Sequence, residues 1–248
     1  MSTSSPLLLV TGARGGLGQA LLHRARRLGW TVAACGRDPQ ALQGLPADLL
    51  IGADVTQAEG AASAVAACRQ QLGRAPDRLA HCVGSTLVAP LHRTTAPQAE
   101  TLLRVNLLSA LHMLGAWVEG LREPPAPGAA VLVSSVVARV GVANHEAIAA
   151  AKGGIEALAR SAAATYAPQG LRINVVAPGM TETPMTAGML KLPAMREAAA
   201  RQYPLGGVQQ ADEVAAVMAW LLGEEAGRIT GQVIPVDGGF TAVRPLVR

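Results

Sequence analysis

Lys152 is the residue whose type and position most directly suggest chemistry. It is one of only two lysines, with Lys191, and it lies in an alanine-rich stretch typical of a helix. Its positive charge would lower the pKa of nearby acidic groups. Ile148, four residues earlier, would share its helix face but has no proton to donate. His145 lies seven residues before Lys152, and an imidazole there could donate a proton from the same face.

A glycine-rich turn near the N-terminus indicates a nucleotide site. Gly12, Gly16 and Gly18 follow the apolar run 7–10, and apolar residues then recur at helical spacing over 15–28. Without glycine side chains in the way, backbone N–H groups can approach a pyrophosphate, which the positive end of the helix also attracts. Three glycines alone could form a simple tight turn, but the strand before them and the helix after them favour a nucleotide.

The glycine spacing in the run 11–18, TGARGGLG, resembles the nucleotide loop of the short-chain dehydrogenase/reductase family. The resemblance extends from about Leu7 to Phe240. It implies that a nicotinamide dinucleotide is held by Gly12, Arg14, Gly16, Leu17, Gly18, Arg37, Asp54, Val55, Gly84, Lys152, Pro178, Gly179 and Thr183. At the fourth strand, where the family has Asn-Asn-Ala-Gly, this chain has His81-Cys82-Val83-Gly84, and only the glycine matches.

The resemblance also implies roles for four polar residues. Ser135 stands 13 residues before Ile148, which is the family's serine-to-tyrosine spacing, so Ser135 would bind a substrate oxygen and Ile148 replaces the tyrosine that supplies the proton. Lys152 would contact the nicotinamide ribose. Asn106 would anchor a water relay to this lysine, or would be a helix-interior residue satisfied by backbone groups.

The missing proton donor has several candidate replacements. His145 and Lys152 have a separation that resembles the tyrosine–lysine separation of the enoyl-acyl-carrier-protein reductases, and Glu146 is a second candidate. Alternatively, Asn144 caps the helix, and His145 and Glu146 are exposed residues of its first turn. Tyr203 could reach the site only by movement of the segment that carries it. Tyr166 lies 14 residues beyond the lysine, about 21 Å along a straight helix, and is excluded.

Three functions follow as hypotheses. The leading one is an NADP(H)-dependent oxidoreductase with an atypical active site, because carbonyl reduction needs a hydride on carbon and a proton on oxygen. The second is an enoyl- or dienoyl-type C=C reductase, which protonates carbon through another donor. The third is a non-catalytic NADP(H)-binding protein or partner subunit.

The end of the second expected strand favours NADP(H) over NAD(H). Gly36 occupies the position where an acidic residue would hold the ribose hydroxyls of NAD. Arg37 and Arg14 provide guanidinium groups that suit a 2′-phosphate, although Arg37 could equally stack on adenine or be solvated. Asp38 comes one residue too late and is expected to cap the next turn. Asp54 could equally cap the helix near Thr56.

Alternating strands and helices predict an α/β protein: a Rossmann-type, doubly wound parallel sheet of about seven strands in a single domain, 1–248. The expected helices include 98–121 and 147–166, which by resemblance pack across a subunit interface in a homotetramer or homodimer. The segment 181–204 shows no clear strand, and its length suggests a flexible lid over a pocket. Its apolar residues suggest a partly apolar small-molecule substrate, although core packing would explain them equally well: Met185, Met189 and Leu190.

Composition narrows the possible partners. The chain is 50% hydrophobic and 15% charged, with a net charge of +4. Its arginines are scattered without interleaved aromatic residues, which favours solvated helix faces over a nucleic-acid surface. The three cysteines lack metal-ligand spacing, so no metal is expected and a reducing compartment is indicated. No apolar run approaches 18 residues and no leader pattern is present. We therefore expect a cytoplasmic location and no membrane partner.

Overall fold

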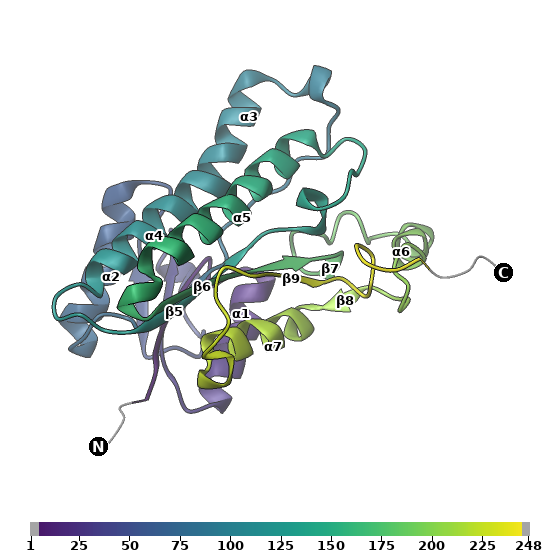
Figure 1. The fold of residues 1–248 in the computed structure, drawn as a ribbon. Helices are drawn as coiled ribbons and strands as arrows, with labels where there is room; N and C mark the ends of the chain where they lie inside the picture. The colour runs from purple at the N-terminus through teal and green to yellow at the C-terminus, as the bar shows by residue number, and fades with distance from the viewer. Residues whose placement is uncertain (1–4, 245–248) are drawn as a thin grey trace.

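A seven-stranded parallel sheet forms the centre of the molecule (Figure 1), as the sequence predicts. The computed structural model describes residues 5–244, so both ends of the expected domain 1–248 lie outside the described residues. In spatial order the strands are β3 (Leu49–Gly52), β2 (Thr31–Gly36), β1 (Leu7–Thr11), β4 (Arg78–His81), β5 (Gly128–Val133), β6 (Leu171–Pro178) and β9 (Val233–Val236).

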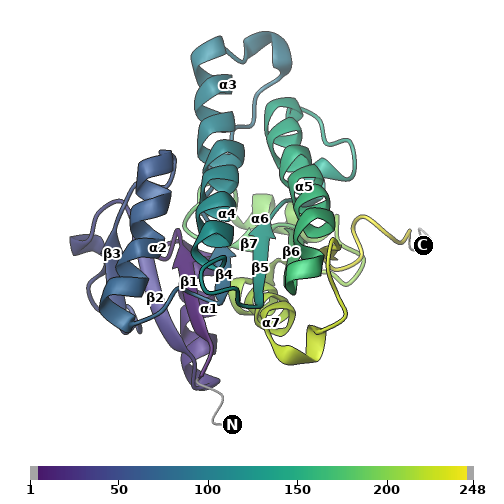
Figure 2. The same ribbon diagram turned by 60° about the vertical axis from the view of Figure 1, so that its left-hand side comes forward.

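Helices cover both faces of the sheet (Figure 2), which makes the fold the predicted Rossmann type. One face carries α1 (Gly16–Arg27) and α7 (Ala211–Leu222), which contact each other. The other carries α2 (Ala58–Leu72), α4 (Ser109–Gly120) and α5 (Glu146–Tyr166). The strand order reverses between β1 and β4, and in such sheets ligands bind in the crevice outside the carboxyl ends of the strands at this point.

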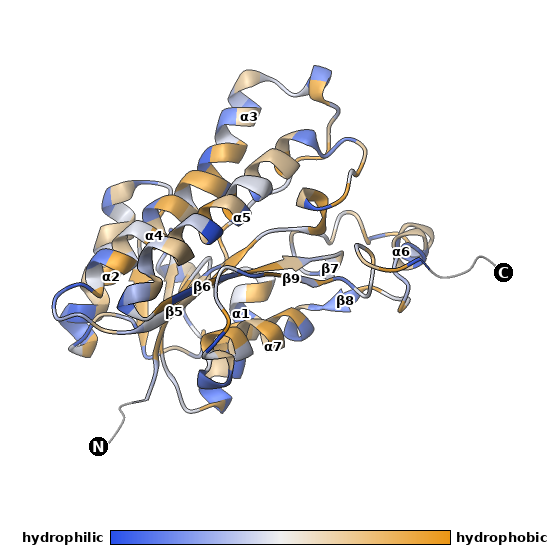
Figure 3. Cartoon of the chain, in the orientation of Figure 1, coloured by the Kyte–Doolittle hydropathy of each residue, from blue (hydrophilic) through white to orange (hydrophobic). Residues whose placement is uncertain are grey.

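Strand β1 shows why a sheet covered on both faces needs a continuous apolar sequence. All five of its residues are buried. Leu7 and Leu9 pack into the core beneath α2 and α4, whereas Leu8 and Val10 pack into the core beneath α1 and α7. Successive side chains point to opposite faces, so each face receives an apolar residue from every second position. In Figure 3, orange, apolar stretches alternate with white or blue, more polar ones along helices α4, α5 and α7, which cover the sheet.

The expected helix 98–121 is a helical segment interrupted by one wider turn. It consists of α3 (Ala96–Leu103), a π-helical turn (Arg104–Leu108) and α4. By length and composition this segment could cross a membrane, with a mean hydropathy of 1.3. It packs against α2 and α5 in the fold, where its apolar side face belongs to the core. A Cβ on Gly154 of α5 would lie 2.8 Å from the Leu107 side chain, so the glycine permits this close packing.

The segment 181–204 contains more regular structure than the sequence predicts. Strand β7 (Thr181–Glu182) pairs in parallel with β8 (Gln209–Gln210), and helix α6 (Pro193–Ala200) follows. The expectation of no strand in this segment was therefore wrong. The β7–β8 ladder is only two residues long and forms with a partner just beyond the segment, so it has no local alternating pattern that a sequence could reveal.

Candidate active site

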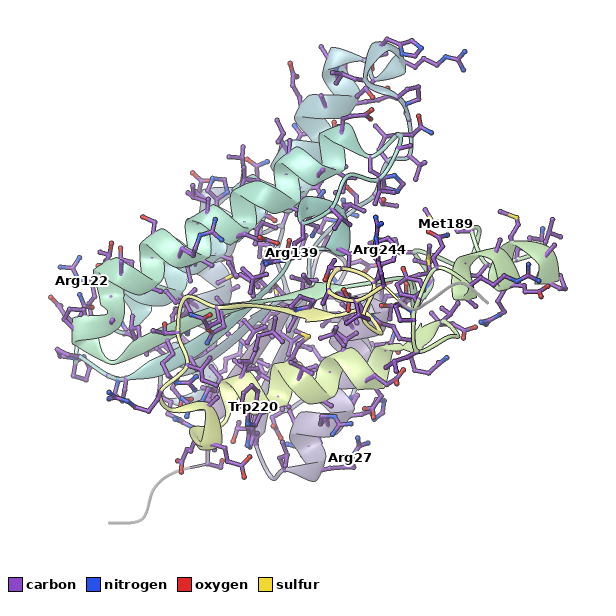
Figure 4. The ribbon with its side chains drawn as sticks, turned by 45° about the vertical axis from the view of Figure 1, so that its right-hand side comes forward. Arg27, Arg122, Arg139, Met189, Trp220 and Arg244 are labelled. Atoms are coloured by element: carbon purple, nitrogen blue, oxygen red, sulfur yellow. The ribbon has the colours of Figure 1, made fainter. Side chains whose placement is uncertain are left out.

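A pocket of about 380 Å³ opens at the carboxyl ends of β4, β5 and β6, beside the glycine turn that follows β1. Its lining comes from three parts of the chain: the glycine turn, the strand ends with the start of α5, and the segment 181–204 with the residues after β9. Met189 is labelled in Figure 4 on the segment 181–204, and Arg139 on the connection that follows β5. The pocket thus lies where the fold predicts a ligand.

Three glycines of the turn occupy positions where a side chain would not fit. Gly12 has a φ of +67°, and a Cβ on it would lie 2.7 Å from the Cys82 carbonyl carbon. A Cβ on Gly18 would lie 2.5 Å from the Gly12 carbonyl oxygen, and one on Gly16 would lie 2.7 Å from Thr183 Cγ2. No side chain caps the start of α1. The backbone N–H groups at this helix end therefore fit an anionic group such as a pyrophosphate.

Lys152 is buried at the floor of the pocket, where its Nζ donates a hydrogen bond to the Val133 carbonyl oxygen at 2.9 Å. Burial lowers the pKa of this amine to about 8, and the neighbouring Cys82 thiol partly counteracts the shift. A Cβ on Gly84 would lie 3.4 Å from Lys152 Nζ. The ammonium therefore keeps two N–H groups beyond the bond to Val133, in a site with little water to screen its charge.

Asn106 is fully buried in the π-helical turn and links two elements. Its Nδ2 donates to the Leu102 carbonyl oxygen at 2.9 Å and to Ser85 Oγ at 3.2 Å, and its Oδ1 accepts from the Ser85 backbone N–H at 3.2 Å. A Cβ on Gly84 would lie 3.0 Å from this Oδ1. Asn106 Oδ1 and Lys152 Nζ therefore both lie next to the same face of Gly84, and the backbone satisfies the asparagine in part, as one of the sequence alternatives expected.

His81 replaces an amide at the end of β4 with a fully bonded imidazole. Its Nδ1 lies 2.8 Å from Thr11 Oγ1 and its Nε2 lies 3.0 Å from Ser109 Oγ. Ser109 donates its proton to the Val105 carbonyl oxygen, so we assign the Nε2–H tautomer, with Thr11 donating to Nδ1. Burial, together with the charge of Lys152, lowers the pKa of His81 to about 3. This histidine is a neutral connector between β1, β4 and α4.

Two serines at the end of β5 have different surroundings. Ser135 lines the pocket, and its Oγ accepts a long hydrogen bond from the Val137 backbone N–H at 3.4 Å. Its hydroxyl proton is thus available to a ligand. Ser134 instead donates to Glu156 Oε1 at 2.9 Å, and the buried Glu156 carboxylate contacts Arg139 Nη1 at 3.4 Å. Sequence reasoning missed Glu156, because its partners come from a strand end and a loop distant in sequence.

His145 and Ile148 both line the pocket from the start of α5. His145 Nδ1 donates to the Ala143 carbonyl oxygen at 2.7 Å, which leaves Nε2 available. The expected helix cap at Asn144 was wrong: His145 is the cap residue, and Asn144 has a φ of +63°, a left-handed conformation that asparagine tolerates. Glu146 is exposed and does not line the pocket, whereas the Ile148 side chain is buried in it.

The residues beyond β2 form a second, more open hollow. Arg14 lines it and donates to the Ala41 carbonyl oxygen at 2.7 Å, while Arg37 is exposed. A Cβ on Gly36 would lie 3.1 Å from the Leu42 side chain. Asp38 caps the next turn as predicted, because its Oδ1 accepts from the Gln40 N–H at 2.9 Å. Among residues 5–244, no acidic side chain lines this hollow.

The residues after β3 are mainly structural. Asp54 Oδ1 accepts from the Thr56 backbone N–H at 3.0 Å, the capping role expected as its alternative. Val55 is buried in the core. On the other side of the molecule, Pro178, Gly179 and Thr183 line the pocket as the nucleotide resemblance implies.

Comparisons with known proteins identify relatives of this chain in sequence and in fold. A sequence model described as enoyl-(acyl carrier protein) reductase matches residues 12–241. The cis-4-hydroxycyclohexanecarboxylate dehydrogenase of Sinomonas cyclohexanicum is 33% identical over 95% of this chain and 96% of its own length. The 3-oxoacyl-[acyl-carrier-protein] reductase FabG of Pseudomonas aeruginosa is 34% identical over 97% of this chain and 99% of its own. The solved structure of ElxO with NADP bound has a TM-score of 0.89 at 21% identity, covering 97% of this chain and 100% of that one.

The chain belongs to the short-chain dehydrogenase/reductase family. Its named relatives are dehydrogenases and reductases, and it is an NAD(P)H-dependent oxidoreductase. The resemblance stated from the glycine turn is therefore confirmed for the family and for the fold.

The sequence analysis of this dehydrogenase/reductase did not place Tyr203 in the pocket. Tyr203 was expected to need a movement of its segment, but it already lines the pocket. It lies just after α6 in sequence, and its position depends on contacts with Gly179 and Phe240 that no local pattern reveals. Tyr166 lies outside the pocket lining, at the far end of α5, and packs against the core.

Proposed function

We propose that this protein is an NADP(H)-dependent reductase whose active site works without the family's tyrosine. The observation that carries the proposal is that Lys152, Ser135, His145 and Ile148 line one pocket, with Ile148 one helical turn from the lysine. This arrangement supports Ile148 as the occupant of the tyrosine position. It also supports a different source for the proton.

The residues of the glycine turn fit a dinucleotide, because backbone fills the space that side chains would occupy at Gly12 and Gly18. When bound, the cofactor supplies a hydride to the substrate. Lys152 would hold the nicotinamide ribose from the pocket floor. Arg14 and Arg37 would hold a 2′-phosphate, and the absence of an acidic side chain at Gly36 removes the repulsion that such a phosphate would meet.

His145 is the proposed proton donor. Its Nδ1–H is committed to the Ala143 carbonyl oxygen, so Nε2 is the nitrogen that exchanges protons in the pocket. The Ser135 hydroxyl would orient the substrate oxygen, and the protonated Nε2 would donate to that oxygen. Solvent then returns the proton to the imidazole, since His145 is only partly buried.

The test is oxidation of NADPH and NADH over a panel of ketones, quinones and enoyl thioesters. We expect turnover with a higher kcat/KM for NADPH. Changing His145→Ala should reduce kcat by about 100-fold, the range of a lost general acid. The matched control is His23→Ala, because His23 is exposed on α1 and lies outside the pocket.

Each other outcome has a defined meaning. Unchanged kcat in the His145→Ala variant would remove this histidine as the acid. Turnover confined to enoyl thioesters would instead favour C=C reduction, consistent with the description of the matching family. Binding of NADPH without turnover of any substrate would contradict the proposed reductase mechanism.

A further inference from the structure

Tyr203 is held rigidly against one wall of the pocket. A Cβ on Gly179 would lie 2.7 Å from Tyr203 Cε1, so the ring packs directly on the glycine backbone. On another side the ring meets Phe240, with ring centroids 5.2 Å apart and an interplanar angle of 39°. These contacts fix the direction of the phenol without using its hydroxyl group.

The hydroxyl group keeps a proton that it can donate. Its oxygen accepts a hydrogen bond from the Met180 backbone N–H at 2.6 Å, and an amide can only donate. Within residues 5–244, no acceptor lies in hydrogen-bonding distance of this hydroxyl. Burial raises the pKa of Tyr203, and the nearby Asp237 carboxylate adds to the shift, so the phenol stays neutral. The pocket therefore contains an uncommitted O–H donor.

Tyr203 and Ser135 reach the pocket from different strand ends. Lys152 and Ser135 sit at the end of β5. The Tyr203 hydroxyl is bonded to the backbone just after β6, and its ring contacts Phe240, which follows β9. Neighbouring strands are about 4.8 Å apart, so the backbone groups that hold the two hydroxyls are offset along the pocket edge. This offset allows Tyr203 to bind a second polar group of the same substrate.

The charges around Tyr203 favour an uncharged partner. Asp237 is close enough to influence Tyr203 electrostatically, and its Cβ lies 3.3 Å from the position of a Cβ on Gly179, on which the ring packs. Among residues 5–244, no arginine lines the pocket, and its one lysine is at the β5 side. A carboxylate beside Tyr203 would thus face a negative charge without a nearby cation, whereas a carbonyl or hydroxyl oxygen would only need the phenol proton.

We propose that Tyr203 binds a second, uncharged oxygen of the substrate, which makes compact apolar ketones with another carbonyl or hydroxyl group on the opposite side the preferred substrates. The inference rests on the proposed reductase function. The pocket lining supports it, since it includes the apolar side chains of Ile148, Met185 and Met189.

The experiment compares three ketones that differ only opposite the reacting group: cyclohexanone, cyclohexane-1,4-dione and 4-oxocyclohexanecarboxylate. Their kcat/KM values are measured with NADPH in wild type and in Tyr203→Phe. After correction for its two equivalent carbonyls, we expect the dione to be preferred over cyclohexanone by about fivefold, the effect of one neutral hydrogen bond. This preference should disappear in Tyr203→Phe. The carboxylate should not be preferred over cyclohexanone in either protein.

The comparison separates binding from a structural role. Tyr203→Phe keeps the ring on Gly179 and Phe240 but removes the partner of the Met180 N–H, and that loss would lower kcat/KM for all three ketones in parallel. Tyr166→Phe makes the same chemical change outside the pocket and should retain the dione preference. An equal dione preference in wild type and in Tyr203→Phe would overturn the proposal.

A second measurement distinguishes failure of this proposal from failure of the reductase function. Binding of cyclohexanone and the dione is titrated by ligand-detected NMR without cofactor. If the wild type reduces no ketone, the proposed function fails, and weaker dione binding to Tyr203→Phe than to wild type still supports the Tyr203 contact. If dione binding is the same in both proteins, the contact is absent whether or not ketones are reduced.

Discussion

The two walls of the pocket are built in different ways. On the wall formed by β4, β5 and α5, buried polar groups such as Lys152, Asn106 and Glu156 have partners at defined distances. The segment 181–204 contributes Met185 and Met189 to the lining beside threonine side chains, and several of its large apolar residues remain exposed, including Met185 at 52% and Leu192 at 56%. The first wall can hold reacting atoms precisely, whereas the second provides adaptable apolar contact. Changes on the first wall should therefore alter kcat, and changes on the second should alter KM.

The largest expected effect is on the polar wall, which is the one formed by β4, β5 and α5. Lys152→Met keeps an apolar stem of similar length but removes the cation from the pocket floor, so kcat/KM with NADPH should fall by about 1000-fold. The control is Lys191→Met, which removes the other lysine from an exposed position outside the pocket. Steady-state kinetics of both variants, with ketone substrates, give the comparison. A loss of less than tenfold would show that the polar wall does not set the rate.

The same variant has a pH signature. Because burial lowers the pKa of Lys152 from 10.5 to about 8, the unfolded chain binds more protons than the folded one between these values. The free energy of unfolding of the wild type should therefore rise by about 3 kcal/mol relative to Lys152→Met as the pH increases from 8 to 10.5. Urea unfolding at several pH values measures this difference, and a flat difference would mean that the lysine is hydrated.

Ile148→Tyr should produce a smaller change of opposite sign. A phenol introduced one helical turn from Lys152 would place an acid on the polar wall, where the positive charge favours its ionised form. We expect ketone reduction to increase by about 100-fold. Ile148→Phe supplies the ring without the hydroxyl and should give no gain. If the tyrosine and phenylalanine variants are equal, the remaining polar wall is not arranged for this chemistry.

The smallest effect is expected on the second wall, formed by the segment 181–204, which we call the apolar wall. Met189→Ala removes apolar surface from the pocket lining, so KM for an apolar ketone should rise by about tenfold while kcat stays the same. Met195→Ala, at a 45% exposed position outside the lining, is the matched control. A fall in kcat for Met189→Ala would contradict the division between the walls.

The sequence predicted those parts of the site whose positions follow from local spacing. The glycine turn, the serine after β5 and the helix carrying Lys152 all lie where apolar periodicity and motif spacing indicated, because each depends on a strand end or a helix face. Tyr203 and Glu156 could not be located in this way. Their roles depend on contacts between elements distant in sequence, with Met180 and Ser134 respectively.

Local conformations were also beyond the sequence. The π-helical turn that carries Asn106 leaves no mark on an apolar pattern expected to be one helix. The positive φ of Asn144 moved the helix cap by one residue. In both places the backbone departs from regular geometry beside the pocket, where tertiary contacts override local preference.

The contact of His81 with Thr11 joins the first strands of the two halves of the sheet. The chain enters one half through β1 and the other through β4, so the halves could in principle separate along this seam. The imidazole connects β4 to β1 across this seam and, through Ser109, also connects β4 to α4. Neither half can open alone without leaving buried polar atoms unpaired. The two halves of the sheet should therefore unfold as one cooperative unit.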